Sequence, residues 1–189
     1  YLCLTQIFTS LNAANRFVET MIPYYTLGNT DILKLHKTAF LCSRKCSADI
    51  VLKSYDWAIE QREKGICVIS GFHSKIEKDV LYYLIKGAQP IILALARGLK
   101  TRLDPELKKA LDNNRLLMIT PFEKKAKRVT SETANLRNHL MAELADEIFI
   151  AYASKGGNLE SLVSEIFQTG KQIYTFEGKN IRTKNYKTS

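Results

Sequence analysis

The sequence predicts an α/β domain built on a doubly wound, mainly parallel sheet of about six strands, with helices on both faces. One observation is a series of short apolar runs, rich in β-branched residues and bounded by Gly, Pro or polar residues. The second is that an amphipathic helical pattern follows almost every run. The runs are continuously hydrophobic rather than alternating, which is typical of strands buried on both faces.

The elements follow one another in a regular order from about residue 37. The predicted strands are 38–42, 66–69, 90–95, 116–119, 148–151 and 172–176. The predicted helices are 47–64, 74–86, 105–112, 131–145 and 159–168. Ser47 is a plausible N-cap of the first helix and Gly65 follows its end. Right-handed crossovers between such strands give a doubly wound, Rossmann-like arrangement.

Both ends of the chain differ from this pattern. Residues 1–35 are interpreted as an N-terminal helical extension, interrupted by Pro23 and Gly28, and residues 36–178 as the main domain. Residues 179–189 form a polar, basic tail that we expect to be flexible. Because the first residue is Tyr1 and not methionine, it stays open whether residues upstream of Tyr1 are missing.

The composition favours an anionic partner. The 189 residues carry a formal net charge of +9, with an estimated pI of 9.4. This excess indicates nucleic acid, nucleotides or an anionic surface, although it could serve solubility alone. No apolar run is long enough to span a bilayer, and no signal peptide is recognisable. We therefore expect a cytoplasmic protein.

Four cysteines give no metal-binding pattern. They are Cys3, Cys42, Cys46 and Cys67. Cys42 and Cys46 lack a second pair or a suitably spaced histidine, so we expect no zinc site and reduced thiols. His73, the best placed histidine, has no Asp or Cys beside it, so we expect no catalytic residue. We also expect no cofactor.

Small and basic residues follow the predicted strands, at the edge where open parallel sheets bind their ligands. Ser70-Gly71 and Gly156-Gly157 allow close backbone approach, and each pair precedes a helix whose N-terminal amides attract anions. Arg137 and Asn138, on a helix, could reach the same pocket. The candidate residues for binding phosphate or nucleic acid are Ser43, Arg44, Lys45, Ser70, Gly71, His73, Arg97, Gly98, Arg137, Asn138, Lys155, Gly156, Gly157 and Asn158. The alternative is that these are ordinary turns.

Four of these segments resemble the DNA-processing protein A (DprA/Smf) family. Cys42-Ser43-Arg44 resembles its Gly-Ser/Thr-Arg turn, and residues 68–72 resemble its Val-Ser-Gly-Leu turn. Residues 92–99 resemble the strand that ends in Gly-x-Gly-Leu-Asp. Leu136-Arg137-Asn138, with the strand after it and the turn at 155–159, resembles the Arg-Asn-Arg region. The order and spacing agree from about residue 36 to residue 178.

The sequence also departs from the family pattern. Residues 73–77 replace Ala-Arg-Gly-Ile-Asp, Lys100 stands where the family has Asp, and His139 takes the place of the second Arg. These differences indicate a divergent or stand-alone member, with residues 1–35 as a remnant of an N-terminal helical domain.

The resemblance implies that single-stranded DNA binds in a basic pocket during DNA uptake, transformation and recombination. It also implies a homodimer and cooperation with a recombinase of the RecA type. An alternative is a protein that binds a nucleotide or nucleotide-sugar, or a phosphoribohydrolase of the lysine-decarboxylase-like group. That group uses a Gly-Gly-x-Gly-Thr-x-x-Glu loop, and residues 156–160 lack its Gly-Thr. A module with a vestigial pocket is a third possibility.

Overall fold

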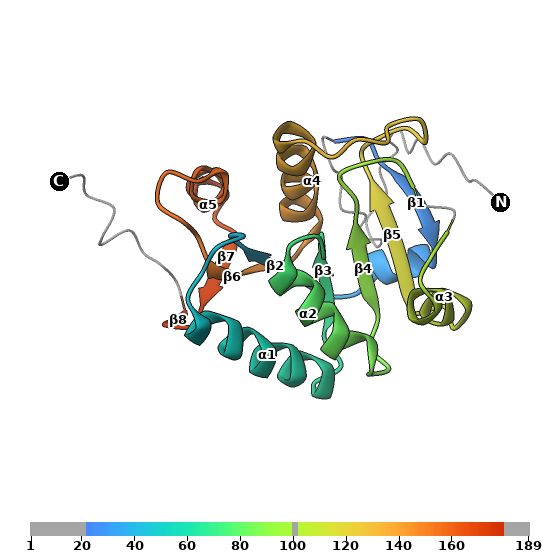
Figure 1. The fold of residues 1–189 in the computed structure, drawn as a ribbon, viewed down its shortest axis with the longest axis horizontal. Helices are drawn as coiled ribbons and strands as arrows, with labels where there is room; N and C mark the ends of the chain where they lie inside the picture. Colours follow the sequence, from blue (N-terminus) through green and yellow to red (C-terminus); the bar gives the residue numbers. More distant parts are fainter. Residues whose placement is uncertain (1–21, 100–101, 180–189) are drawn as a thin grey trace, which may run out of the picture.

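The computed structural model describes residues 22–99 and 102–179, and confirms the predicted fold class (Figure 1). The strands are β1 Tyr25–Gly28, β2 Lys37–Cys42, β3 Cys67–Ser70, β4 Ile91–Ala94, β5 Leu116–Thr120, β6 Glu147–Tyr152, β7 Gln172–Thr175 and β8 Gly178–Lys179. The helices are the 3-10 helix η1 Thr30–Lys34, α1 Ala48–Glu63, α2 Lys75–Ile85, α3 Pro105–Asp112, α4 Ser131–Leu144 and α5 Asn158–Gln168. Most bounds lie within one or two residues of the prediction.

In the described part of the chain the strands form one sheet in the order β1-β5-β4-β3-β2-β6-β7-β8. The six strands from β5 to β7 are parallel, and β1 and β8 are antiparallel at the two edges. β2 therefore lies between β3 and β6. The chain runs from β2 towards β3 in one direction and from β6 towards β7 in the other, which makes the β2–β6 boundary the switch point of the sheet.

The two faces of the sheet bury separate cores. On one face α1, α2 and α3 cover residues such as Phe40, Val68 and Met118. On the other, α4, α5 and η1 cover residues such as Ala39 and Ile119. Neighbouring residues of a strand thus face opposite cores, so continuous apolar runs are needed.

Two details at the edges differ from the prediction. Tyr25–Gly28, predicted as part of a helical extension, is a strand that pairs with β5. The reason is that this β-prone segment satisfies its amides on the otherwise open edge of β5. β8 was not predicted; it pairs with β7 after the turn at Phe176 and Glu177, and its first residue, Gly178, has a φ of +119°. The expectations for residues 1–21 and 180–189 lie outside the described residues.

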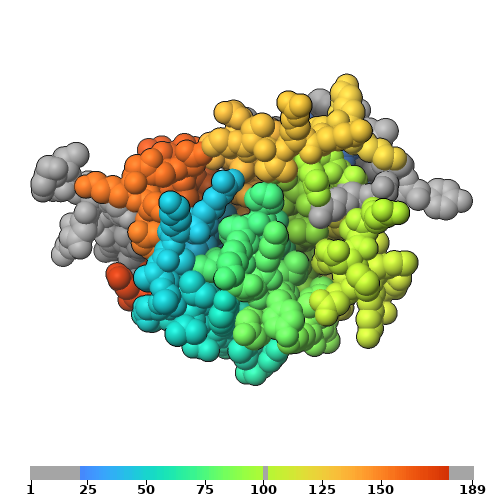
Figure 2. Space-filling model, viewed as in Figure 1, coloured from blue at the N-terminus to red at the C-terminus, as the bar shows by residue number. Residues whose placement is uncertain are grey.

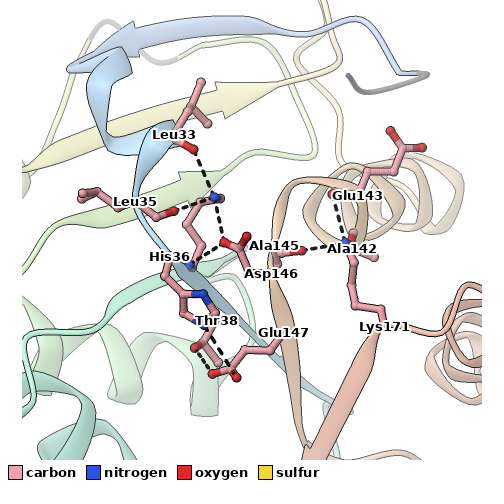
Figure 3. Close-up of polar contacts among 11 residues, drawn as sticks. Leu33, Leu35, His36, Thr38, Ala142, Glu143, Ala145, Asp146, Glu147 and Lys171 are labelled. Carbon is pink, nitrogen blue, oxygen red and sulfur yellow. Dashed lines mark hydrogen bonds and ion pairs between the residues drawn. The ribbon is translucent and has the colours of Figure 1, made fainter. Parts of the chain in front are cut away.

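An ion pair between the buried Lys37 and the more exposed Asp146 joins the start of β2 to the residue before β6, at the amino edge of the sheet (Figure 3). Lys37 is only 1% exposed, and its Nζ donates to Asp146 Oδ2 at 2.9 Å and to the carbonyls of Leu33 and Leu35. The Lys37 backbone N–H also donates to Asp146. Nearby, Lys171 Nζ donates to carbonyls at the end of α4, Glu143 and Ala145 among them. These contacts fix the strands beneath the candidate site.

No described helix is long and apolar enough to cross a membrane.

Candidate anion-binding site

The turns that follow β2 and β6 are joined at the switch point. The Ser43 N–H donates to the Tyr152 carbonyl at 2.8 Å, and the Ser154 N–H donates to Ser43 Oγ at 2.9 Å. In Figure 2 the blue-green β2–α1 turn lies near the orange β6–α5 turn and the green β3–α2 turn, below the gold connection between β5 and α4. The predicted turns therefore gather along one rim.

Arg137 reaches from α4 to the β3–α2 turn. Its side chain lies so close to Gly71 that a Cβ there would be 1.7 Å from Arg137 Nη1. Arg137 is 5% exposed, and its Nε donates to Asn138 Oδ1 at 2.9 Å. Its buried Nη1 has no hydrogen-bond partner among the described residues. A buried donor without a partner costs about 1–3 kcal/mol, so this geometry favours a site that an acceptor from outside completes.

The surroundings of Arg137 are positively charged. Burial lowers the pKa of the Arg137 guanidinium, the charge of Glu77 opposes this, and Arg44 lowers the pKa further. Burial also lowers the pKa of His73, and the charges of Arg137 and Arg44 contribute in the same direction. Arg44 and His73 are exposed at the ends of two neighbouring strands. Three basic side chains from three separate segments thus act on one another, which indicates an anion site.

Two carboxylates accept hydrogen bonds from backbone amides near the helix N-termini that the sequence predicted to bind an anion. Glu77 Oε2 accepts from the N–H groups of His73 and Ser74 and completes a capping box on α2. Glu160 Oε2 accepts from the Gly156 N–H at 2.6 Å. The expectation that the α2 N-terminus is open to an anion is therefore wrong. The Ser-x-x-Glu pattern at 74–77 could have revealed this from the sequence.

The N-terminus of α5 has no side-chain cap. Gly157 is its N-cap residue and contributes no side chain, while Gly156 has a φ of +70°, a conformation that favours glycine. Asn158 Nδ2 donates to Ser131 Oγ at the start of α4, so the two helix beginnings are tied together. Lys155 is exposed on the same turn. Unlike α2, this helix has no side-chain cap, although the Glu160 carboxylate lies in its first turn.

Other candidate residues are placed differently. Ser70 is fully buried and its hydroxyl donates to the Phe40 carbonyl at 2.9 Å, so it holds the strands together and does not face a ligand. Gly98 is buried against the 123–126 loop, whose Ala126 carbonyl accepts its N–H. Arg97 is half-buried beside it, at the end of β4, and its carbonyl accepts from Thr120. No described contact joins Arg97 or Gly98 to Arg137. Lys45 is exposed beside Arg44.

The backbone at the site is strained. Phe72, directly after Gly71, has a φ of +44° although it is not glycine. Such a conformation costs about 1–3 kcal/mol and persists where the surroundings enforce it. Tyr152, 39% exposed at the end of β6, adds an aromatic surface beside Ser43. Among the described residues no cluster of His, Cys, Asp and Glu could hold a metal ion.

Comparison with known proteins identifies the family. A sequence model described as DNA recombination-mediator protein A matches residues 14–188. The chain belongs to this family. The resemblance predicted from the turns is thereby confirmed. No curated protein sequence matches the chain significantly.

Solved structures share the fold of this family member. DNA processing protein A from Streptococcus pneumoniae aligns with a TM-score of 0.66 and 20% identity, over 80% of this chain and 54% of that one. The protein from Helicobacter pylori, studied for its single-stranded DNA binding mode, aligns with a TM-score of 0.66 and 15% identity, over 92% and 82%. A molybdenum cofactor binding protein from Rippkaea orientalis reaches 0.53 at 9% identity, over 75% and 76%. The chain thus spans about half the length of the Streptococcus pneumoniae protein.

Proposed function

We propose that the rim formed by the turns after β2, β3 and β6 binds the phosphates of single-stranded DNA, in DNA uptake and recombination. Arg137 carries the proposal, because its buried Nη1 lacks a partner among the described residues. A guanidinium binds phosphate oxygens through strong, charge-assisted hydrogen bonds, often in a bidentate way. The family relationship and the printed description of the Helicobacter pylori protein support DNA as the source of that phosphate.

The exposed groups around Arg137 suit a strand rather than a single phosphate. Arg44, Lys45 and Lys155 lie on turns joined through Ser43 and can follow successive phosphates. Tyr152 supplies a π-surface on which a base can stack without sequence preference. Single-stranded DNA offers both successive phosphates and bases that are free to stack.

A nucleotide is the second candidate ligand, favoured by the uncapped N-terminus of α5 at Gly157. A helix N-terminus that follows a glycine turn holds a single phosphate group well. This site needs only one phosphate, whereas a strand engages several cations at once. The two ligands therefore differ in how their affinity depends on salt.

Fluorescence anisotropy with a labelled oligothymidylate, measured at several salt concentrations, tests the proposal. We expect log Kd to rise linearly with log salt concentration, and Arg44→Ala to reduce the slope by about 1. Lys108→Ala is the matched control, because Lys108 is exposed on α3 and pairs with Asp112. Competition by a nucleoside monophosphate at low concentration, with a shallow salt slope, would support the nucleotide instead. Failure of both ligands to bind would overturn the proposal.

The remaining partners follow from the family relationship alone. We propose a homodimer that acts with a recombinase of the RecA type in the cytoplasm. The described cysteines, Cys42, Cys46 and Cys67, are free thiols, as a reducing compartment favours. Light scattering of the purified chain would test the dimer, and a monomer at micromolar concentration would contradict it.

A further inference from the structure

Two cysteines bracket the turn that carries Arg44. Cys42 is the last residue of β2, and Cys46 directly precedes Ser47, the N-cap of α1. The chain bends at Arg44 and Lys45, so that both thiols pack into the hydrophobic core between the sheet and α1. Cys46 lies close enough to Cys42 to raise the pKa of its thiol, and the Cys42 thiol donates to the Ser43 carbonyl at 3.4 Å. The third described cysteine, Cys67, begins β3 and belongs to the core on the other face of the sheet.

We propose that Cys42 and Cys46 are a redox-active dithiol, which closes into a disulfide around the Ser43–Lys45 turn and thereby weakens anion binding at the rim. The second part depends on the proposed function; the first does not. A disulfide requires two sulfurs that can approach without moving distant backbone, and two thiols that flank one bent turn and pack against the same apolar cluster meet that condition.

The two thiols differ in reactivity. Burial raises the pKa of Cys42 far above its ordinary value, and the neighbouring Cys46 adds to the shift. Cys42 is 8% exposed, whereas Cys46 is partly exposed and follows two basic residues at the positive end of α1. An oxidant reaches an accessible thiol before a buried one. Cys46 therefore reacts first and Cys42 resolves the product.

Hydrogen peroxide is the oxidant that we invoke. The Cys46 thiolate attacks one peroxide oxygen and the O–O bond breaks, which gives a sulfenic acid and a hydroxide that takes up a proton to become water. The Cys42 sulfur then attacks the Cys46 sulfur, the S–O bond breaks, and the hydroxyl leaves as water with the proton of the Cys42 thiol. The two thiols lose two electrons and two protons in total, and peroxide is reduced to two waters.

The bond would change the rim through Ser43 and Arg44. Ser43 accepts from the Ser154 N–H and donates to the Tyr152 carbonyl, and Arg44 acts electrostatically on Arg137. Drawing Cys46 towards Cys42 shortens the turn that holds both residues. Because the closed ring has only five residues, it adds little conformational constraint to the unfolded chain, and a thiol reductant opens it readily.

Peptide mapping of the full chain decides whether the bond forms. After treatment with peroxide and alkylation, trypsin cleaves at Lys37, Arg44, Lys45 and Lys53, so a disulfide links peptides 38–44 and 46–53. We expect the linked pair, two hydrogen atoms lighter than the separate peptides, and its loss with dithiothreitol. Cys46→Ser should abolish it, whereas the matched variant Cys3→Ser should retain it. Alkylation of both thiols, or a Cys46–Cys46 link between chains, would overturn the proposal.

Oligonucleotide anisotropy tests the consequence. The oxidised chain is expected to bind about tenfold more weakly, the loss of roughly one charge-assisted contact. Cys46→Ser should bind equally with and without peroxide, and the fluorescence of the buried Trp57 checks that it is folded. Unchanged affinity in a chain that contains the linked peptides would refute the regulatory part. If the reduced chain binds no oligonucleotide, the proposed function fails, and the peptide map still decides the dithiol.

Discussion

Replacing Arg137 with methionine separates a binding role from a structural one. Methionine keeps much of the length and apolar contact of the arginine stem but removes every N–H group. In the free protein Arg137 combines a gain and a cost: Nε donates to Asn138, whereas the buried Nη1 has no partner in the described structure. The substitution deletes both at once.

The two contributions to folding nearly cancel. The hydrogen bond of a charged donor is worth about 1.5–3 kcal/mol, and the unpaired buried donor costs about 1–3 kcal/mol. We therefore expect the free energy of unfolding of Arg137→Met to lie within about 1 kcal/mol of wild type, a change in Tm of roughly 2–4 °C at most. By contrast Leu140→Ala, on the same helix at a fully buried position, should cost about 2–5 kcal/mol.

Binding should respond strongly. Loss of one charge-assisted hydrogen bond, about 1.5–3 kcal/mol, corresponds to roughly 10- to 150-fold weaker binding of an oligothymidylate. Urea unfolding, followed by the emission of Trp57, measures stability, and anisotropy measures affinity. Trp57 is the sole tryptophan in the sequence and is 7% exposed. A variant that loses more than about 3 kcal/mol of stability but binds DNA normally would refute the reasoning, because Arg137 would then be structural.

Three further predictions follow from the same geometry. Gly71→Ala places a Cβ 1.7 Å from Arg137 Nη1, so it should displace the guanidinium, reduce oligonucleotide affinity and cost about 1–3 kcal/mol in urea unfolding; normal affinity would contradict this. Burial and the charge of Arg137 lower the pKa of His73 below 6.5, and a bound phosphate favours its protonated form. Affinity should therefore rise as the pH falls below about 6.5, and His73→Asn should flatten that profile. At the opposite edge burial alone would raise the pKa of Asp146, but hydrogen bonds from Lys37 outweigh it, and the pKa is lowered. This stabilisation is present above the unfolded pKa and is lost as pH falls through the folded one, so Asp146→Asn should lose at least about 1.5 kcal/mol at pH 7 and approach wild type below about pH 4; a pH-independent difference would refute it.

Much of the fold could be predicted from local sequence. Strand and helix positions follow from apolar runs and helical spacing, since burial on two faces demands continuous hydrophobic residues. The start and end of α1 follow from Ser47, whose side chain accepts from the Ile50 N–H, and from Gly65, with a φ of +71°. Helix caps are local interactions, so residues a few positions apart suffice to predict them.

The composition of the site required the tertiary structure. The strand order brings β2 beside β6, and in the turns that follow them Ser43 and Ser154, far apart in the sequence, are joined by a hydrogen bond. That order depends on how α4 crosses the sheet, which side-chain packing decides and local propensity does not. Gly71 was predicted to let a ligand approach, yet Arg137 occupies that space.

Sequence alone thus determined that the strand-to-helix turns share one edge of the sheet, because parallel strands all end there. It determined the excess of positive charge as well, since charge is a sum over residues. Only the tertiary structure decided which of those groups are available. The Ser70 hydroxyl donates to the Phe40 carbonyl, and the amides of the β3–α2 turn donate to the Glu77 carboxylate. Arg137 keeps an unpaired donor among the described residues. Availability depends on distances between segments remote in the chain, and these are fixed only when the two cores pack.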